Sequence, residues 1–101
     1  MPQLRYSRNA LYDLQRLHKF ISVKNPVAAK RARNSILKSV QLLGQQPHIG
    51  RPIEDMPHEY REWVVDFGDS GYVIYYYVSK DETTILAVRH QKEAPLIDYE
   101  N

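Results

Sequence analysis

The spacing of apolar residues changes character near the middle of this chain, and this change limits the folds available to it. Up to Leu43 the apolar residues recur every three or four positions, which places them on one face of an α-helix. From Trp63 onwards they alternate with polar residues or form dense β-branched and aromatic runs, as is typical of β-strands. Helices followed by strands favour an α+β domain.

Two helices are predicted in the first half. Ser7 is the expected N-cap of the first helix. Asn25 and Pro26 form a second start signal, because Asn is a favourable N-cap and Pro is tolerated at the first helical position. Gly44 is the expected C-terminal cap, and Pro47 prevents continuation of the helix. Because the connection between the helices is short, they are expected to form a hairpin.

Three strands are predicted in the second half of the chain, at residues 62–67, 72–78 and 83–89. Short turns join them, so they should pair antiparallel as a meander, and residues 4–6 are available as a fourth strand. The predicted fold is α+β with the order β-α-α-β-β-β, a helical hairpin packed on a small, mainly antiparallel sheet. Residues 1–94 should form a single domain, followed by a C-terminal tail at 95–101.

Composition restricts the kind of protein further. A chain of 101 residues is long enough for one domain, and the absence of cysteine suits a reducing compartment such as the cytoplasm. The N-terminal residues lack the apolar segment of a signal peptide, and no run approaches the roughly 20 apolar residues that span a bilayer. The four histidines lack metal-ligand spacing. We therefore expect a cytoplasmic protein with no metal, no cofactor and no membrane partner.

Charge is distributed unevenly, although the net charge is only +2. Residues 1–53 carry ten Lys and Arg but one acid, Asp13, whereas residues 54–101 carry four Lys and Arg and eleven acids. A summed positive field attracts anions before any contact forms. The basic half is therefore expected to face an acidic or polyanionic partner, although single cations on helices are commonly only solvated.

Several short motifs together resemble the RelE/ParE toxin superfamily over about residues 4–94. They are Ala10, Asp13-Leu14, Pro26, Ala29, Pro47, Gly50-Arg51-Pro52, Gly71-Tyr72 and the segment 85–94. The last is the most specific, and it is similar to the end of the final strand in the ParE-type branch, often labelled plasmid stabilisation proteins. The resemblance implies a toxin encoded beside an antitoxin that wraps it. Some members of the superfamily poison DNA gyrase, and others cut mRNA on the ribosome.

These two activities place different demands on the sheet. Cleavage of RNA by its 2′-hydroxyl needs a base, an acid and cations near the phosphate. The positions that are basic in the RelE branch correspond here to Val64, Asp66 and Val73. Loss of those cations favours a ParE-like inhibitor of DNA gyrase without catalytic residues. The alternative is a RelE-like ribosome-dependent mRNA endonuclease, for which the fallback catalytic residues are Glu62, His90 and Arg61.

Two contact surfaces are predicted for such a toxin. The expected target-binding residues are Arg61, Arg89, His90, Gln91 and Lys92. The basic hairpin should bind an acidic segment of the cognate antitoxin through Leu14, Arg16, Leu17, Ile21, Arg31 and Arg33. The predicted assembly is a homodimer or a toxin–antitoxin hetero-oligomer. A third class, a nucleic-acid-binding module that uses the basic hairpin directly, has no supporting motif.

Overall fold

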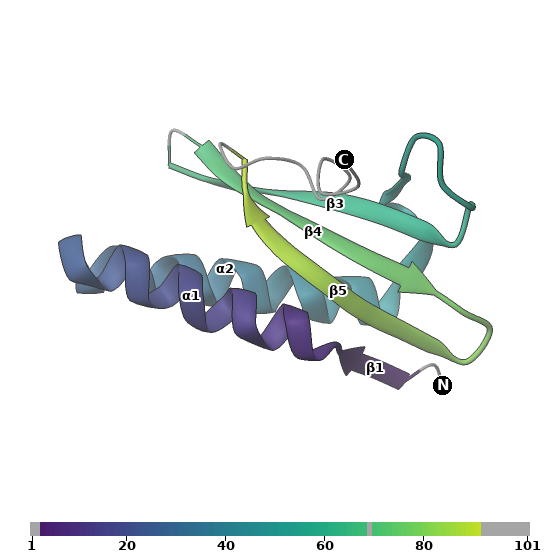
Figure 1. Ribbon diagram of the computed structural model, residues 1–101, viewed down its shortest axis with the longest axis horizontal. Helices are drawn as coiled ribbons and strands as arrows, with labels where there is room; N and C mark the ends of the chain where they lie inside the picture. Colours follow the sequence, from purple (N-terminus) through teal and green to yellow (C-terminus); the bar gives the residue numbers. More distant parts are fainter. Residues whose placement is uncertain (1–2, 69, 92–101) are drawn as a thin grey trace.

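The computed structural model describes residues 3–68 and 70–91. In chain order the elements are β1 (Gln3–Tyr6), α1 (Arg8–Lys24), α2 (Pro26–Gln45), the 3₁₀ helix η1 (Pro47–Ile49), β2 (Arg51–Pro52), β3 (Tyr60–Phe67), β4 (Ser70–Val78) and β5 (Glu82–His90). Within these residues five strands form one sheet in the order β1-β5-β4-β3-β2, and the α1–α2 hairpin covers one face (Figure 1). The predicted α+β fold is confirmed. The predicted tail, 95–101, lies outside the described residues, and the domain limits 1–94 stay a prediction.

The predicted N-caps of both helices are present. Ser7 Oγ accepts a hydrogen bond from the Ala10 N–H at 3.0 Å. Asn25 Oδ1 accepts one from the Ala28 N–H at 3.0 Å, while the Asn25 N–H donates to the Ile21 carbonyl oxygen at 2.9 Å. A single residue therefore ends α1 and starts α2, which leaves the turn of the hairpin little freedom.

The C-terminal end of α2 lies beyond Gly44, the predicted cap. The helix continues to Gln45, and the N–H of Gln46 donates to the Leu42 carbonyl oxygen at 2.8 Å. Pro47 ends the helix, because the residue before a proline is disfavoured in the helical region. Gln46 accordingly has φ −132° and ψ 74°.

The sheet contains the predicted antiparallel meander of β3, β4 and β5. Strand β1 adds a parallel neighbour to β5, with Tyr6 opposite Ile85, so the fourth strand proposed at residues 4–6 is also confirmed. The short strand β2 was not predicted from the sequence. It pairs antiparallel with β3 through Arg51 and Glu62, because the extended backbone at Gly50 directs the chain along the edge of the sheet.

The larger hydrophobic core lies between the sheet and the helical hairpin. Strand β4 contributes Tyr72, Ile74, Tyr76 and Val78 to it, and the helices contribute Ala10, Leu17, Ala32, Ile36, Val40 and Leu43. Tyr75 points to the other face, where it is buried with Ile53 and Ala87. Since strand side chains alternate between faces, Tyr77 also lies on the face away from the helices, which we call the open face.

Candidate binding surfaces

A groove of about 430 Å³ lies between α1 and α2 and reaches β1. Apolar side chains make up most of its lining: Tyr6, Leu11, Leu14, Leu17, Ile21, Ala29, Ala32, Ile36 and Leu37. Its polar lining residues are Gln15, His18 and Arg33. The small side chains of Ala29 and Ala32 leave this space between the helices. An apolar groove with a few polar groups suits the apolar face of a partner segment.

The structure brings together four of the six residues predicted to bind the antitoxin. Leu14, Leu17, Ile21 and Arg33 all line the groove. Leu17 is only 5% exposed and also belongs to the core, so it forms part of the groove floor. Arg31 is exposed on α2 and Arg16 lies beside Asp13, and neither lines the groove.

The sequence analysis did not single out several groove residues. Leu11, Gln15 and His18 follow one another at intervals of four and three residues, so they form a helical stripe beside Leu14 and Ile21. This spacing was available in the sequence.

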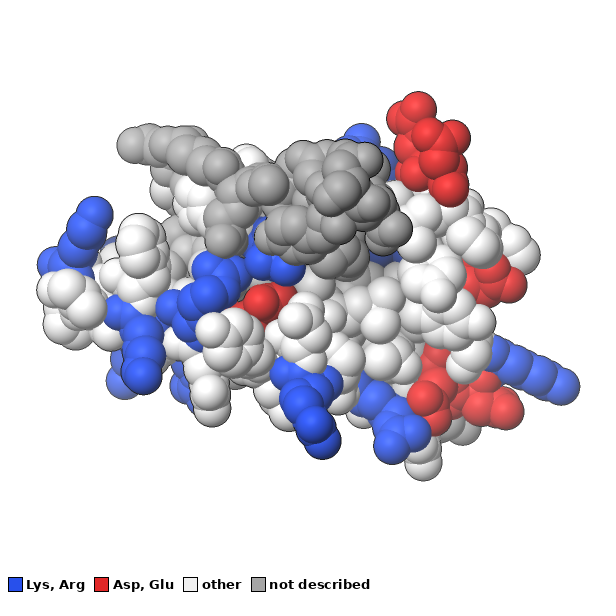
Figure 2. All heavy atoms as spheres, viewed as in Figure 1, with Lys and Arg blue, Asp and Glu red and all other residues white. Residues whose placement is uncertain are grey.

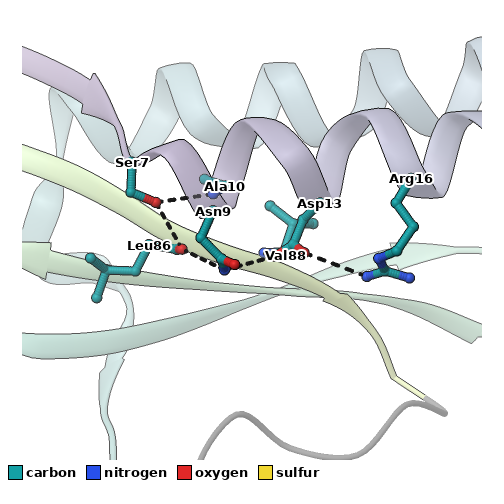
Figure 3. Close-up of polar contacts among 7 residues, drawn as sticks. All are labelled: Ser7, Asn9, Ala10, Asp13, Arg16, Leu86 and Val88. Atoms are coloured by element: carbon teal, nitrogen blue, oxygen red, sulfur yellow. Dashed lines mark hydrogen bonds and ion pairs between the residues drawn. The ribbon is translucent and has the colours of Figure 1, made fainter.

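The N-cap Ser7 and polar side chains of α1 bind the edge of β5 beyond the end of β1 (Figure 3). Ser7 Oγ and Asn9 Nδ2 donate to the Leu86 carbonyl oxygen at 2.9 and 3.3 Å. Asp13 Oδ2 accepts a hydrogen bond from the Val88 N–H at 3.0 Å. The spacing of Asn9 and Asp13 along α1 matches the spacing of Leu86 and Val88 along β5, because four helical residues rise about 6 Å and two strand residues about 6.6 Å. These side chains satisfy backbone groups that would otherwise need another strand.

Asp13 is the charged centre of this contact and is 2% exposed. Its carboxylate also lies 3.7 Å from Arg16 Nη2 and 3.4 Å from Asn9 Nδ2. Burial of a carboxylate is costly unless it is hydrogen-bonded or paired, and both conditions hold here. Asp13 therefore holds α1 against β5. This structural role is sufficient to account for Asp13 in the sequence motif.

The open face of the sheet carries aromatic, apolar and acidic side chains. Tyr60 and Tyr77 meet edge to face with ring centroids 4.9 Å apart. Val64 is 42% exposed, stands opposite Val73 in the register, and is followed on the same face by the exposed Asp66. The positions for which the RelE resemblance implies basic residues, Val64, Asp66 and Val73, thus lie together on the open face.

The acid–base pair suggested for an endonuclease, Glu62 with His90, is not assembled. Glu62 stands opposite Tyr75 on the open face, where its Oε2 lies 2.5 Å from Arg51 Nε. His90 pairs with Tyr72 and meets its ring edge to face at 5.4 Å on the helix-facing side. The sheet lies between the two groups, so they are not placed to exchange a proton directly, and the fallback catalytic residues stay a prediction.

Arg61, the third fallback catalytic residue, donates hydrogen bonds to the backbone of the segment before β2. Its Nη1 donates to the Gly50 carbonyl oxygen at 2.7 Å and to that of His48 at 3.4 Å. The neighbouring Tyr76 hydroxyl donates to the Pro47 carbonyl oxygen at 2.7 Å and accepts from the Gly50 N–H at 2.9 Å. Burial raises the pKa of Tyr76, although the Gly50 N–H and the Arg61 charge act in the opposite direction. Both side chains thus have structural partners.

The remaining residues predicted to bind the target lie around the end of β5. Arg89 pairs with Val73 on the open face, whereas His90 lies on the helix-facing side. Gln91 follows the strand and is exposed. Lys92 lies outside the described residues. The predicted target-binding set is therefore divided between the two faces of the sheet.

Comparison with known proteins agrees with this architecture. Residues 4–95 match the family model described as ParE toxin of type II toxin-antitoxin system, parDE. The chain belongs to the ParE toxin family. It is 33% identical over 93 residues to Toxin RelE3 of Caulobacter vibrioides, which covers 92% of this chain and 98% of that protein.

Solved structures share the fold of this ParE-family toxin. The chromosomal ParDE system from P. aeruginosa superposes with a TM-score of 0.71 at 22% identity, covering 89% of this chain and 96% of that one. The isolated E. coli RelE toxin gives a TM-score of 0.64 at 17% identity, covering 99% and 95% of the two chains. At these identities the likeness concerns the fold alone.

The charged side chains of the two sequence halves also occupy different parts of the molecular surface. In Figure 2, Lys and Arg side chains of the ParE-family toxin lie along the helices from the left to the lower right. Most Asp and Glu side chains lie at the right, beside the strand connections, with some Lys and Arg among them. In the part of the chain that the structure describes, no group of His, Asp and Glu side chains could hold a metal ion. No helix within the same part is long and apolar enough to cross a membrane.

Proposed function

We propose that this ParE-family toxin acts in the cytoplasm by binding DNA gyrase and that it does not cleave RNA itself. The observation that supports this most is the separation of Glu62 and His90 by the sheet. Val64 and Asp66 add to it, because they put apolar and acidic groups where phosphate would need cations. An inhibitor that holds gyrase on cut DNA needs a complementary surface and no acid–base pair of its own.

The second candidate is a RelE-like ribosome-dependent mRNA endonuclease. It is favoured by the 33% identity to a protein named Toxin RelE3. Under this alternative Arg89 and the tyrosines of the open face would contact RNA, since aromatic rings stack on bases and Arg binds phosphate.

A supercoiling assay separates the two functions. We expect micromolar toxin to stop supercoiling by purified gyrase and to leave cleaved DNA in the reaction. Ribosome-bound mRNA treated in parallel should remain intact by primer extension. Toxin premixed with its antitoxin is the control and should leave gyrase active. Normal supercoiling together with cut mRNA would establish the endonuclease instead.

We further propose that the groove between α1 and α2 binds the cognate antitoxin. Its lining offers apolar walls with Arg33 and His18 among them, which fits an antitoxin segment that has apolar anchors and acidic neighbours. A volume of about 430 Å³ is enough for a few large side chains but not for a whole helix. The antitoxin segment would therefore lie over the groove and insert side chains into it.

Variants at the groove should weaken the antitoxin complex. The double variant Leu11→Ala/Arg33→Glu removes an apolar wall and reverses a lining charge, so we expect about twentyfold weaker binding with slower association. Arg31→Glu is the matched control on the same helix outside the groove and should change affinity less than about threefold. Surface plasmon resonance with the antitoxin measures both. Equal losses for the two variants would mean that general charge, and not the groove, attracts the antitoxin.

A further inference from the structure

The turn of the helical hairpin exposes large apolar side chains. Phe20 is 66% exposed, Val23 85% and Val27 63%. They lie on the last turn of α1 and the first turn of α2, which project beyond the strands at the left of Figure 1. We call Phe20, Val23 and Val27 the hairpin tip. Exposed apolar side chains gathered in one place commonly mark an interaction site.

The surroundings of the hairpin tip are cationic. Lys24 Nζ lies 5.4 Å from the centroid of the Phe20 ring, and Lys19 and Lys30 are exposed nearby in the sequence. No Asp or Glu occurs anywhere between residues 14 and 53. A partner must therefore offer an apolar recess with negative charge around it, because like charges would oppose association.

The turn that joins the two helices at the hairpin tip is short and hydrogen-bonded. Asn25 is the only residue between the helices, and it caps both of them. Little conformational freedom is lost when such a tip enters a recess, which favours binding. It is separate from the groove, whose lining includes none of the tip residues. On α1, Phe20 instead continues the stripe of Asp13 and Arg16, at intervals of three and four residues.

We propose that the hairpin tip is the surface by which the toxin docks on its protein target, in an apolar recess rimmed by carboxylates. This inference rests on the proposed function, under which the recess belongs to gyrase. Aliphatic Val23 and Val27 contribute nothing to contacts with phosphates, so nucleic acid is disfavoured. An anionic membrane would need a continuous apolar face along a helix, whereas on the outer surface of α1 the exposed Tyr12 is flanked by the cations Arg8 and Lys19.

The test uses Phe20→Ala/Val23→Ala. Both residues are exposed and alanine favours helix, so the variant should remain folded, as circular dichroism will confirm. We expect the toxin concentration for half-inhibition of supercoiling to rise at least about tenfold, while antitoxin affinity stays within about twofold. Tyr12→Ala is the matched control: this ring is 63% exposed on the same helix but distant from the tip, and its loss should leave inhibition unchanged.

A second variant tests the charge. Lys19→Glu/Lys24→Glu should slow association with gyrase about tenfold and flatten its dependence on salt. Unchanged inhibition by both tip variants would overturn the proposal and leave gyrase as the target. A wild-type toxin without any effect on gyrase would overturn the proposed function and this inference together. Loss of binding to phosphatidylglycerol vesicles by Phe20→Ala/Val23→Ala, with inhibition of gyrase intact, would assign the tip to membranes and would also overturn it.

Discussion

Replacing Asp13 with alanine should lower the free energy of unfolding by about 3 kcal/mol. Asp13 Oδ2 accepts a hydrogen bond from the Val88 N–H at 3.0 Å, so the change leaves this N–H buried without an acceptor. The substitution removes the carboxylate beside Arg16. It also releases the middle of α1 from the edge of β5. An unsatisfied buried donor costs more than a typical hydrogen bond contributes, because water no longer reaches it.

Urea unfolding of purified variants measures this loss. Asp13→Asn keeps an acceptor oxygen for the Val88 N–H but not the charge, so we expect it to lose about half as much stability. Asp66→Ala is the control, because Asp66 is an exposed acid on β3 and its removal should change stability by less than about 0.5 kcal/mol. A loss below about 1 kcal/mol for Asp13→Ala would show that α1 is held mainly by its apolar contacts.

Gly50→Ala should also destabilise the fold by about 3 kcal/mol. The backbone of Gly50 has φ −73°, which any residue can adopt, so the requirement for glycine comes from close contact. An added Cβ would collide with the Tyr76 hydroxyl and lie 2.7 Å from the Glu62 carbonyl oxygen. Relief of that collision would break the hydrogen bond from the Gly50 N–H to Tyr76.

A second glycine provides the matched control for this experiment. At Gly44, inside α2, an added Cβ would be 3.5 Å from the nearest atom of Leu4, which is an ordinary contact. Gly44→Ala should therefore be neutral or stabilise the helix by up to about 1 kcal/mol. Thermal unfolding of both variants checks the pair. Similar melting temperatures for the two would mean that the segment before β2 moves freely enough to accept a side chain.

Local signals in the sequence predicted the elements well because they act over a few residues. Ser7 and Asn25 mark helix starts through hydrogen bonds that span three residues. The short strand β2 was missed for the same reason, since Arg51 and Pro52 have no strand pattern of their own. Their pairing with β3 depends on a partner ten residues or so along the chain.

The contact surfaces were predicted only in part. The spacing of apolar residues identified Leu14 and Ile21, which line the groove. Arg16 was added to the predicted set because of its charge, and it does not line the groove. The structure assigns Arg16 to the opposite side of α1, because Asp13 and the edge of β5 lie there. Charge alone carries no information about which side of a helix meets a neighbour.

The sequence by itself determined the α+β order, the helix N-caps and the excess of positive charge on the hairpin, since each depends on neighbours along the chain. Only the tertiary structure decided which face of the sheet each residue of β5 occupies. Tyr75 pairs with Ala87 and Tyr76 with Ile85, so Leu86 is an extra residue that forms a bulge. Because side chains alternate with a period of two, one extra residue exchanges the faces of every position after it, including that of His90.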